Sequence, residues 1–431
     1  MTPAGRASAA IEVLSDLAAR KRPASEALKD WGLAHRFAGS GDRAAIGSLV
    51  FDCLRQRASL AFAMEDDSPR ALALRALVTA WGMLPNSVDT LCDGSRFAPE
   101  PLSDAERAGL ACALPAEVPS WIRGDYPQWL DASFAGMFGG DAAEEGAALS
   151  VRAPVDLRVN TLKANRGKVL KALARFAPHP TAYAASGLRI AARQGPARTP
   201  NVEADAAHGK GWLEVQDEGS QVAAFLSGAG PRLQVIDLCA GAGGKTLALG
   251  AAMQNTGQLY AYDTNRMRLR PIFERLRRAG VRNVQVLEAG EDAGLAPLED
   301  RMDRVVIDAP CTGSGTWRRR PDAKWRLSPE MLSARVADQV AVLDAGAGLV
   351  KPGGRLTYIT CSVLPTENRE QVESFLARHP DFAVTPWREA WDAAIGTEAP
   401  PSADGSDETL LMTPRSHGTD GFFVAVLERR A

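Results

Sequence analysis

The sequence predicts a multidomain protein with an all-α N-terminal part, a small α+β module and a C-terminal α/β domain built on a parallel sheet. Three observations indicate this fold class. The chain has 431 residues, which is too long for one ordinary domain. Its first part carries apolar stripes with helical spacing. From residue 233 onward, continuous apolar strands alternate with helical segments, which is typical of a parallel sheet.

The composition is that of an average globular protein, with 45% hydrophobic and 24% charged residues. No apolar run approaches transmembrane length, and residues 1–23 lack the continuous apolar region of a signal peptide. We therefore expect a cytoplasmic protein with reduced thiols and no membrane partner. The net charge of −2 argues against a protein that binds phosphates over its whole surface, but it does not exclude a local basic face.

The cysteine pattern does not predict a metal site. No two cysteines form a CxxC pair, and no two histidines have the spacing of metal ligands. We expect the three cysteines of the helical part to be structural, and Cys53 in particular to pack in a core. The six cysteines are Cys53, Cys92, Cys112, Cys239, Cys311 and Cys361.

Helical patterns fill the chain from the N-terminus to about residue 147. In "AAIEVLSDLAAR" the apolar residues fall on one stripe, and Pro23 ends this helix. A second helix, "GDRAAIGSLVFDCLRQR", begins with the cap-like pair Gly41-Asp42. We predict a helical domain over residues 1–80 and a helical linker region over 81–147.

A small α+β module follows over residues 148–222. The segment "PVDLRVNTLK" alternates like a strand, "RGKVLKALARF" has a helical pattern, and "GLRI" is a second strand. The α/β domain then occupies residues 223–431. Its strands are predicted in "QVIDL", "QLYAYD", "VQVLEAG", "RVVIDAP" and "GRLTYIT", and the end of the chain is typical of a closing antiparallel hairpin.

The first strand of this domain leads into a glycine-rich turn, "DLCAGAGGKT". A phosphate-binding P-loop would need glycine at Cys239, and a dinucleotide fingerprint would need glycine at Thr246, so both motifs fail. S-adenosylmethionine remains, because its small methionine part fits against closely approaching backbone. The predicted donor-binding residues of this loop are Cys239, Ala240, Gly241, Ala242, Gly243, Gly244 and Lys245.

Two acidic residues follow the next strands. Asp263 closes "LYAYD", where one carboxylate can accept hydrogen bonds from both hydroxyls of the donor's ribose. Asp292 follows the third strand, where the adenine amino group is expected; the alternative for Asp292 is a loop cap.

Two cysteines follow successive strands, Cys311 in "DAPC" and Cys361 in "YITC". The carboxyl ends of neighbouring parallel strands lie within side-chain reach of one another. A thiol beside a methyl donor is what methylation of a pyrimidine at carbon 5 needs, because thiolate addition at carbon 6 makes carbon 5 nucleophilic. A carboxyl near the ring, for which Asp308 is the candidate, can bond ring nitrogen 3 and also contribute to the donor site.

These blocks resemble those of the RsmB/Nop/Sun family of RNA cytosine-5 methyltransferases. The similar segments, in order, are "VDLRVNTLK", "VQDEGSQ", "DLCAGAGGKT", "DAPCTGSGTWRRRPDAKW", "YITCSVLPTEN" and "HGTDGFFVAVL". The resemblance runs from about residue 150 to the end and implies a Rossmann-like S-adenosylmethionine-dependent methyltransferase domain after an RRM-like module. The helical start resembles, less specifically, the NusB-like RNA-binding domain of the bacterial RsmB branch.

The family implies a division of labour between the thiols. By resemblance, Cys361 is the nucleophile, Cys311 assists release of the product, and Lys245 lies close to donor and catalytic groups. The residues alone leave this choice open, because DNA cytosine methyltransferases place their nucleophile in a proline–cysteine dipeptide. One departure is "AGAGGK" where many members have "AAPGGK", and we expect the loop to tolerate it.

RNA contacts are predicted in "TWRRRPDAKWR", where arginines can meet phosphates and Trp317 or Trp325 can stack on a base. Strand-borne contacts are predicted in "LRVN", with a locally hydrogen-bonded turn as the equal alternative. The predicted RNA-binding residues are Arg318, Arg319, Arg320, Lys324, Arg158 and Asn160.

The sequence thus predicts an enzyme that uses S-adenosylmethionine to methylate carbon 5 of a cytosine in RNA, with 16S ribosomal RNA as the expected partner. We expect a monomer that needs no metal. The alternatives are a tRNA or other RNA substrate, a base amino-group methyltransferase, suggested by the likeness of "DAPC" to the D/N-P-P-aromatic motif, or a non-catalytic RNA-binding assembly factor. The amino-group alternative leaves Cys361 unexplained.

Overall fold

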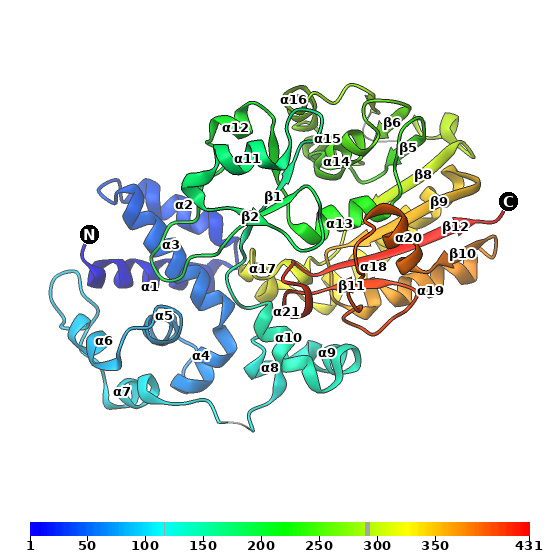
Figure 1. The fold of residues 1–431 in the computed structure, drawn as a ribbon. Coiled ribbons are helices and arrows are strands. Elements are labelled where there is room, and N and C mark those ends of the chain that lie inside the picture. Colours follow the sequence, from blue (N-terminus) through cyan, green and yellow to red (C-terminus); the bar gives the residue numbers. More distant parts are fainter. Residues whose placement is uncertain (116, 289–293) are drawn as a thin grey trace. The chain divides into compact units, whose positions relative to one another are not determined.

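A computed structural model describes residues 1–115, 117–288 and 294–431. The described chain divides into two compact units, and each of them is discontinuous in sequence (Figure 1). The first unit consists of Met1–Ala153, Ala192–Thr199 and Thr316–Leu327. The second consists of Pro154–Ala191, Pro200–Gly315 and Ser328–Ala431.

The first unit is helical, as predicted. Its first helix starts where the Thr2 hydroxyl accepts the Gly5 N–H and Pro3 takes the first helical position, and it ends before Pro23. Cys53 is fully buried in the core, which confirms its structural role. The helices are α1 (Pro3–Arg20), α2 (Ala24–Ala34), α3 (Ser40–Arg55), α4 (Arg57–Met64), α5 (Pro69–Thr79), α6 (Pro85–Leu91), α7 (Asp104–Ala111), α8 (Ser120–Arg123), α9 (Asp131–Phe138), α10 (Ala142–Ala148) and α17 (Pro321–Arg326).

Helix α17 comes from late in the chain, yet it completes the core of this first unit. Trp325 packs against the apolar cluster of α1 to α5, and its indole N–H donates to the Leu54 carbonyl at 2.5 Å. Trp317 is buried and stacks on Phe134, with ring centroids 6.1 Å apart. The segment Thr316–Leu327 is therefore an interior part of the first unit.

The second unit begins with the predicted α+β module. Its four-stranded antiparallel sheet has the order β2-β3-β1-β4, and Leu157, Val169 and Leu188 form its core. The elements are β1 (Val155–Val159), α11 (Arg166–Ala172), β2 (His179–Pro180), β3 (Gly187–Ile190), α12 (Ala206–Gly209) and β4 (Leu213–Val215).

The larger sheet of the second unit has the order β10-β12-β9-β8-β5-β6-β7, with β11 paired to β12 (Figure 1). Strands β5 to β9 are parallel, whereas β12 runs antiparallel to β9, β10 and β11, which confirms the closing hairpin. The strands are β5 (Gln234–Asp237), β6 (Gln258–Ala261), β7 (Val284–Val286), β8 (Met302–Asp308), β9 (Val350–Thr360), β10 (Phe382–Thr385), β11 (Leu410–Met412) and β12 (Phe422–Arg429).

Helices connect these strands and cover the sheet. They are α13 (Glu218–Leu226), α14 (Gly244–Ala252), α15 (Arg266–Leu269), α16 (Ile272–Ala279), α18 (Pro329–Leu349), α19 (Arg369–Arg378), α20 (Trp387–Ala394) and α21 (Pro414–His417). Within the described ranges, no helix is long and apolar enough to span a membrane.

The strand order determines where chemistry can occur. Strand β5 lies between β6 and β8, so the chain order reverses beside it, and β9 follows β8. Ligands of open α/β sheets bind at such a reversal, outside the carboxyl ends of the strands. The residues that end β5, β8 and β9 are Asp237, Asp308 and Thr360.

Candidate active site

The turn after β5 has a backbone that only glycine adopts easily. Gly241 and Gly243 have φ values of 50° and 87°, in the left-handed region. A Cβ atom at Gly243 would also lie 2.5 Å from Cγ1 of Ile272. The turn therefore stays free of side chains on this side, and α14 begins directly after it.

Asp263 faces this turn from the end of β6. Its carboxylate is buried, with 3% exposure, and accepts N–H bonds from Gly241 at 2.9 Å and Asn265 at 2.8 Å. Asp263 and Cys239 line a cavity of about 430 Å³ together with Pro310 of the Cys311 loop. A buried carboxylate beside a glycine turn, at the edge of a cavity of this size, fits the ribose and methionine parts of S-adenosylmethionine.

The remaining donor-site prediction, Asp292, lies outside the described residues. Arg335 and Asp338 of α18 also line the cavity. Sequence reasoning did not select them, because a helical segment shows no sign of which face will meet a ligand.

Lys245 and Asp308 form an ion pair, with Nζ and Oδ1 2.7 Å apart. The lysine is 5% exposed and belongs to the first turn of α14, whereas Asp308 ends β8. Burial raises the pKa of the neighbouring Asp237 to about 7, and the Asp308 carboxylate adds to this rise. Asp237 was not among the predicted site residues, although it ends the strand before the glycine turn.

The two cysteines at the strand ends meet. The sulfur atoms of Cys311 and Cys361 are 3.3 Å apart, and both thiols are free. The hydrogen bond between the sulfurs and the burial of Cys311 raise the pKa of Cys311 well above its ordinary value. The two thiols therefore share one hydrogen bond, in which either sulfur can be the donor.

Burial corrects part of the RNA-contact prediction in the Thr316–Leu327 segment. Lys324 is fully buried, and its ammonium donates to the Arg55 carbonyl and the Ser150 hydroxyl, both at 2.8 Å. Burial lowers its pKa to about 7. Arg318 is only 3% exposed, Arg319 is half-buried, and Arg320 is exposed. Of these four predicted phosphate contacts, only Arg320 has an exposed side chain.

The prediction for the tryptophans of that segment is corrected for Trp317. Trp317 is 1% exposed and cannot stack on a base, and Trp325 is half-buried against the core of the first unit. Sequence reasoning missed this because arginine and tryptophan are common both in RNA-binding faces and in the shells of protein cores.

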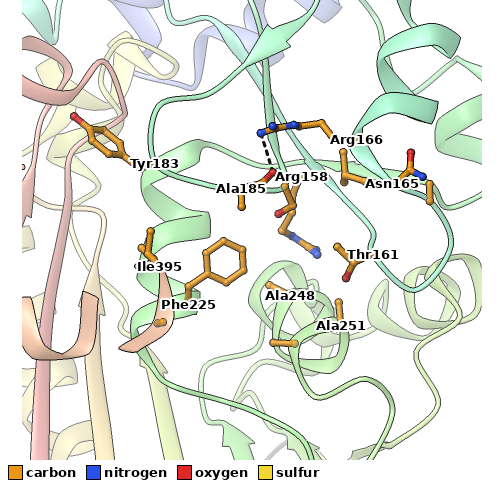
Figure 2. Close-up of a pocket in the computed structure, with 15 residues that line it drawn as sticks. Arg158, Thr161, Asn165, Arg166, Tyr183, Ala185, Phe225, Ala248, Ala251 and Ile395 are labelled. Carbon is orange, nitrogen blue, oxygen red and sulfur yellow. Dashed lines mark hydrogen bonds between the residues drawn. The ribbon is translucent and has the colours of Figure 1, made fainter. Parts of the chain in front are cut away.

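Arg158 and Asn160 are also buried, each with 2% exposure. The Asn160 amide donates to the distant carbonyls of Gly211 and Ala279 at 2.8 and 2.7 Å, and its Oδ1 accepts the Leu162 N–H at 3.2 Å, which is a local turn. Arg158 lies in the wall of a cavity of about 470 Å³, and Figure 2 shows its guanidinium pointing into the space beside Phe225. Its Nε donates to Gln216 at 2.6 Å.

The fold and the site define a class. A parallel sheet with a glycine turn after one strand, a buried acid after the next and a cavity between them is that of an S-adenosylmethionine-dependent methyltransferase. Residues 230–428 match the family described as "16S rRNA methyltransferase RsmB/F", and residues 126–195 match the ferredoxin-like domain of RsmF/B-like methyltransferases. The chain belongs to the RsmB/F methyltransferase family, and its cofactor is S-adenosylmethionine.

Curated relatives agree with this assignment. A probable ribosomal RNA small subunit methyltransferase B of Synechocystis is 33% identical, over 70% of this chain and 67% of the relative. The Bacillus subtilis protein of the same name is 30% identical, over 71% and 66%. The ribosomal RNA small subunit methyltransferase B of Salmonella paratyphi B is 33% identical, over 51% and 48%. The matches thus span about two thirds of the first two relatives and half of the third.

Solved structures share the fold. PH0851 superposes with a TM-score of 0.73 at 24% identity, covering 100% of this chain and 99% of that one. A methyltransferase homologue from Pyrococcus horikoshii superposes with a TM-score of 0.60 at 26% identity, covering 74% and 100%. The predicted order of helical part, small sheet module and Rossmann-like domain is therefore confirmed.

Proposed function

We propose that this protein methylates carbon 5 of a cytosine in small-subunit ribosomal RNA through a covalent cysteine–cytosine adduct. The observation that carries the proposal is the pair of sulfurs, 3.3 Å apart at the ends of β8 and β9. Two adjacent thiols suit a reaction in which one sulfur bonds to the base and the other helps to break that bond. The relatives' names, which specify small-subunit ribosomal RNA, support the choice of substrate.

Each group at the site has its own part in the addition step. The Cys361 thiolate adds to carbon 6, and the ring electrons move so that nitrogen 3 takes up a proton and carbon 5 becomes nucleophilic. The Lys245–Asp308 pair, 2.7 Å apart, supplies that proton, and the Asp308 carboxylate then accepts the hydrogen bond from nitrogen 3. S-adenosylmethionine, held by the glycine turn and Asp263, supplies an electrophilic methyl group.

Release reverses the addition. Water takes the proton from carbon 5, the bond between carbon 6 and sulfur breaks with its electron pair on the Cys361 sulfur, and nitrogen 3 returns its proton to the Lys245–Asp308 pair. Cys311 assists this step from its place beside that sulfur. The base must first leave its stack to reach the two thiols, so we propose an unpaired or extruded cytosine as substrate.

The test uses the purified protein, the donor and small-subunit ribosomal RNA from cells that lack the gene. Digestion to nucleosides and mass spectrometry should show 5-methylcytosine, which Cys361→Ala abolishes. The proposal fails if no 5-methylcytosine forms on this RNA. If only tRNA is methylated, the substrate is tRNA and not ribosomal RNA. If the product is N4-methylcytosine, the result supports the amino-group alternative. If calorimetry detects no binding of the donor, the result supports a non-catalytic RNA-binding factor.

The wider setting is part of the same proposal. We propose a cytoplasmic monomer that needs no metal and uses its helical first unit as a NusB-like RNA-binding domain. Light scattering should then give the mass of one chain, and a chelator should leave activity unchanged. If the protein is a dimer, or if only a metal restores its activity, the proposal of a metal-free monomer is wrong, but the proposed roles of the two thiols are unaffected.

A further inference from the structure

A carboxylate joins the two loops that carry the thiols. Glu367 lies in the short turn after the Cys361 loop and is fully buried. Its Oε1 accepts the backbone N–H of Thr312 at 2.8 Å and the amide of Gln339 at 3.0 Å. Its Oε2 accepts the hydroxyls of Thr312 and Ser362. One carboxylate therefore holds the residue after Cys311 and the residue after Cys361.

The two loops depend on this carboxylate unequally. The Cys361 loop has further support, because the Asn368 amide donates to the Ser362 carbonyl at 2.9 Å and the Ser362 N–H donates to the Thr360 hydroxyl at 3.2 Å. It also continues directly from the central strand β9.

The Cys311 loop is held differently. Its far end is held by Ser314 and Gly315, with the hydroxyl oxygens of Ser314 and Ser362 2.9 Å apart and the Gly315 N–H donating to the Cys361 carbonyl at 3.0 Å. Next to Cys311, however, two hydrogen bonds from Thr312 both end on Glu367 itself. A third, from the Gln339 amide to the Pro310 carbonyl at 2.9 Å, comes from a side chain that is also bonded to Glu367. Loss of the carboxylate should therefore loosen the Cys311 loop more than the Cys361 loop.

We propose that Glu367 is a positioning residue that holds the Cys311 thiol against Cys361 for the release step, an inference that rests on the proposed function. All four of the groups that donate to its carboxylate are neutral. The pKa of Cys311 is raised first by its hydrogen bond to Cys361, then by burial, and then by its electrostatic interactions with Cys361 and with Glu367. Glu367 thus favours both the position and the neutral state of that thiol.

The experiment compares Glu367→Gln with the matched control Glu370→Gln, an exposed acid three residues further on, and with Cys311→Ala as the benchmark for trapped adduct. Full-length protein, donor and substrate RNA are mixed, and the protein–RNA adduct is followed on denaturing gels. We expect Glu367→Gln to form adduct within about threefold of the parent rate. The adduct should persist about tenfold longer, and kcat should fall about tenfold at unchanged KM for RNA. Glu370→Gln should behave like the parent.

The inference is overturned if the adduct of Glu367→Gln decays at the parent rate, or if formation and release fall together with the melting temperature, which would mean a merely structural role. Thr312→Val keeps the side-chain volume and removes one donor to Glu367, so it serves if Glu367→Gln does not fold, with a smaller gain in lifetime expected. Failure of the proposed function is distinguishable, because Cys311→Ala would then trap no adduct at all.

Discussion

Among single residues, Cys311 and Cys361 give the clearest prediction, because substitution of each should have an opposite effect on the covalent adduct. If Cys361 attacks the base and Cys311 assists release, Cys311→Ala should accumulate a covalent protein–RNA adduct, whereas Cys361→Ala should form none. Denaturing gels with labelled RNA and donor measure this directly. Calorimetry with the donor alone should show that both variants still bind it.

The reverse result, an adduct with Cys361→Ala and none with Cys311→Ala, would exchange the two roles. That outcome would match the proline–cysteine nucleophile of DNA cytosine methyltransferases. It would also contradict the proposed function, in which Cys361 forms the bond to the base.

Asp237 gives a prediction about pH and stability. Burial raises its folded-state pKa from 3.8 to about 7. A raised carboxyl pKa contributes stability below the unfolded-state value and loses it as the pH rises through the folded-state value. Asp237→Asn has no such titration. From pH 4 to pH 8, the free energy of unfolding of Asp237→Asn should therefore rise relative to that of the parent protein by on the order of 3 kcal/mol. Urea unfolding across this range measures the gain, and a constant difference would contradict it.

Among single residues, those at the ends of strands were the ones that the sequence could locate. Cys311 and Cys361 follow the neighbouring strands β8 and β9, and Lys245 of α14 meets Asp308 at the end of β8, because parallel strands bring their carboxyl ends together. Glu367 was not predicted. Its role depends on hydrogen bonds to Thr312 and Gln339, from segments that the sequence gives no reason to bring together.

The glycine turn before α14 is the element on which donor binding depends. Gly243→Ala places a Cβ 2.5 Å from Ile272 at a left-handed φ, so we expect donor affinity to fall about tenfold, the equivalent of about 1–2 kcal/mol of backbone strain. Gly244→Ala is the matched control, because a Cβ there has no neighbour within 4 Å. Equal losses in the two variants, measured by calorimetry, would show that strain at Gly243 is not the cause.

The segment Thr316–Leu327 contains the buried Lys324 and the exposed Arg320, and variants of the two residues should have different effects. Lys324→Met removes a buried ammonium with two hydrogen bonds, which should lower the free energy of unfolding by about 2 kcal/mol or more. Arg320→Ala changes an exposed side chain and should leave stability unchanged. If Arg320 meets a phosphate, the same variant should weaken RNA binding and reduce its salt dependence by about one ion.

Unfolding in urea and RNA titrations at several salt concentrations measure both effects. If the Lys324→Met protein is as stable as the parent but binds RNA more weakly, Lys324 contacts RNA and is not a structural residue. The environment of this segment was not predictable from its sequence. The periodicity of α17 is the same whether its basic and aromatic side chains face a nucleic acid or a protein interior.

At the scale of the whole molecule, the first unit is assembled from three separate stretches of chain. The sequence pattern predicts domains that are each continuous along the chain, over residues 1–80, 81–147, 148–222 and 223–431. The return of Thr316–Leu327 to the first unit could not be read from the sequence, because hydrophobic patterns report burial and not the partner that buries them.

A fragment of residues 1–153 should therefore be incomplete. It lacks Trp317 and Lys324, and it leaves Asp125, whose pKa burial raises to about 6, without the charge of Lys324 beside it. We expect the fragment to unfold at a lower temperature and to bind a hydrophobic dye. The same fragment joined to residues 316–327 by a flexible linker should regain stability, as followed by circular dichroism. Equal melting temperatures would show that the late segment contributes nothing.

The late return of this segment also imposes a schedule on the newborn chain. Residue 153 leaves the ribosome long before residue 327 does, and at ordinary synthesis rates the interval is roughly ten to thirty seconds. During that time the first unit lacks the buried side chains of Trp317, Lys324 and Trp325, which complete its interior. Although it is made first, this unit can be finished only after most of the second has been translated.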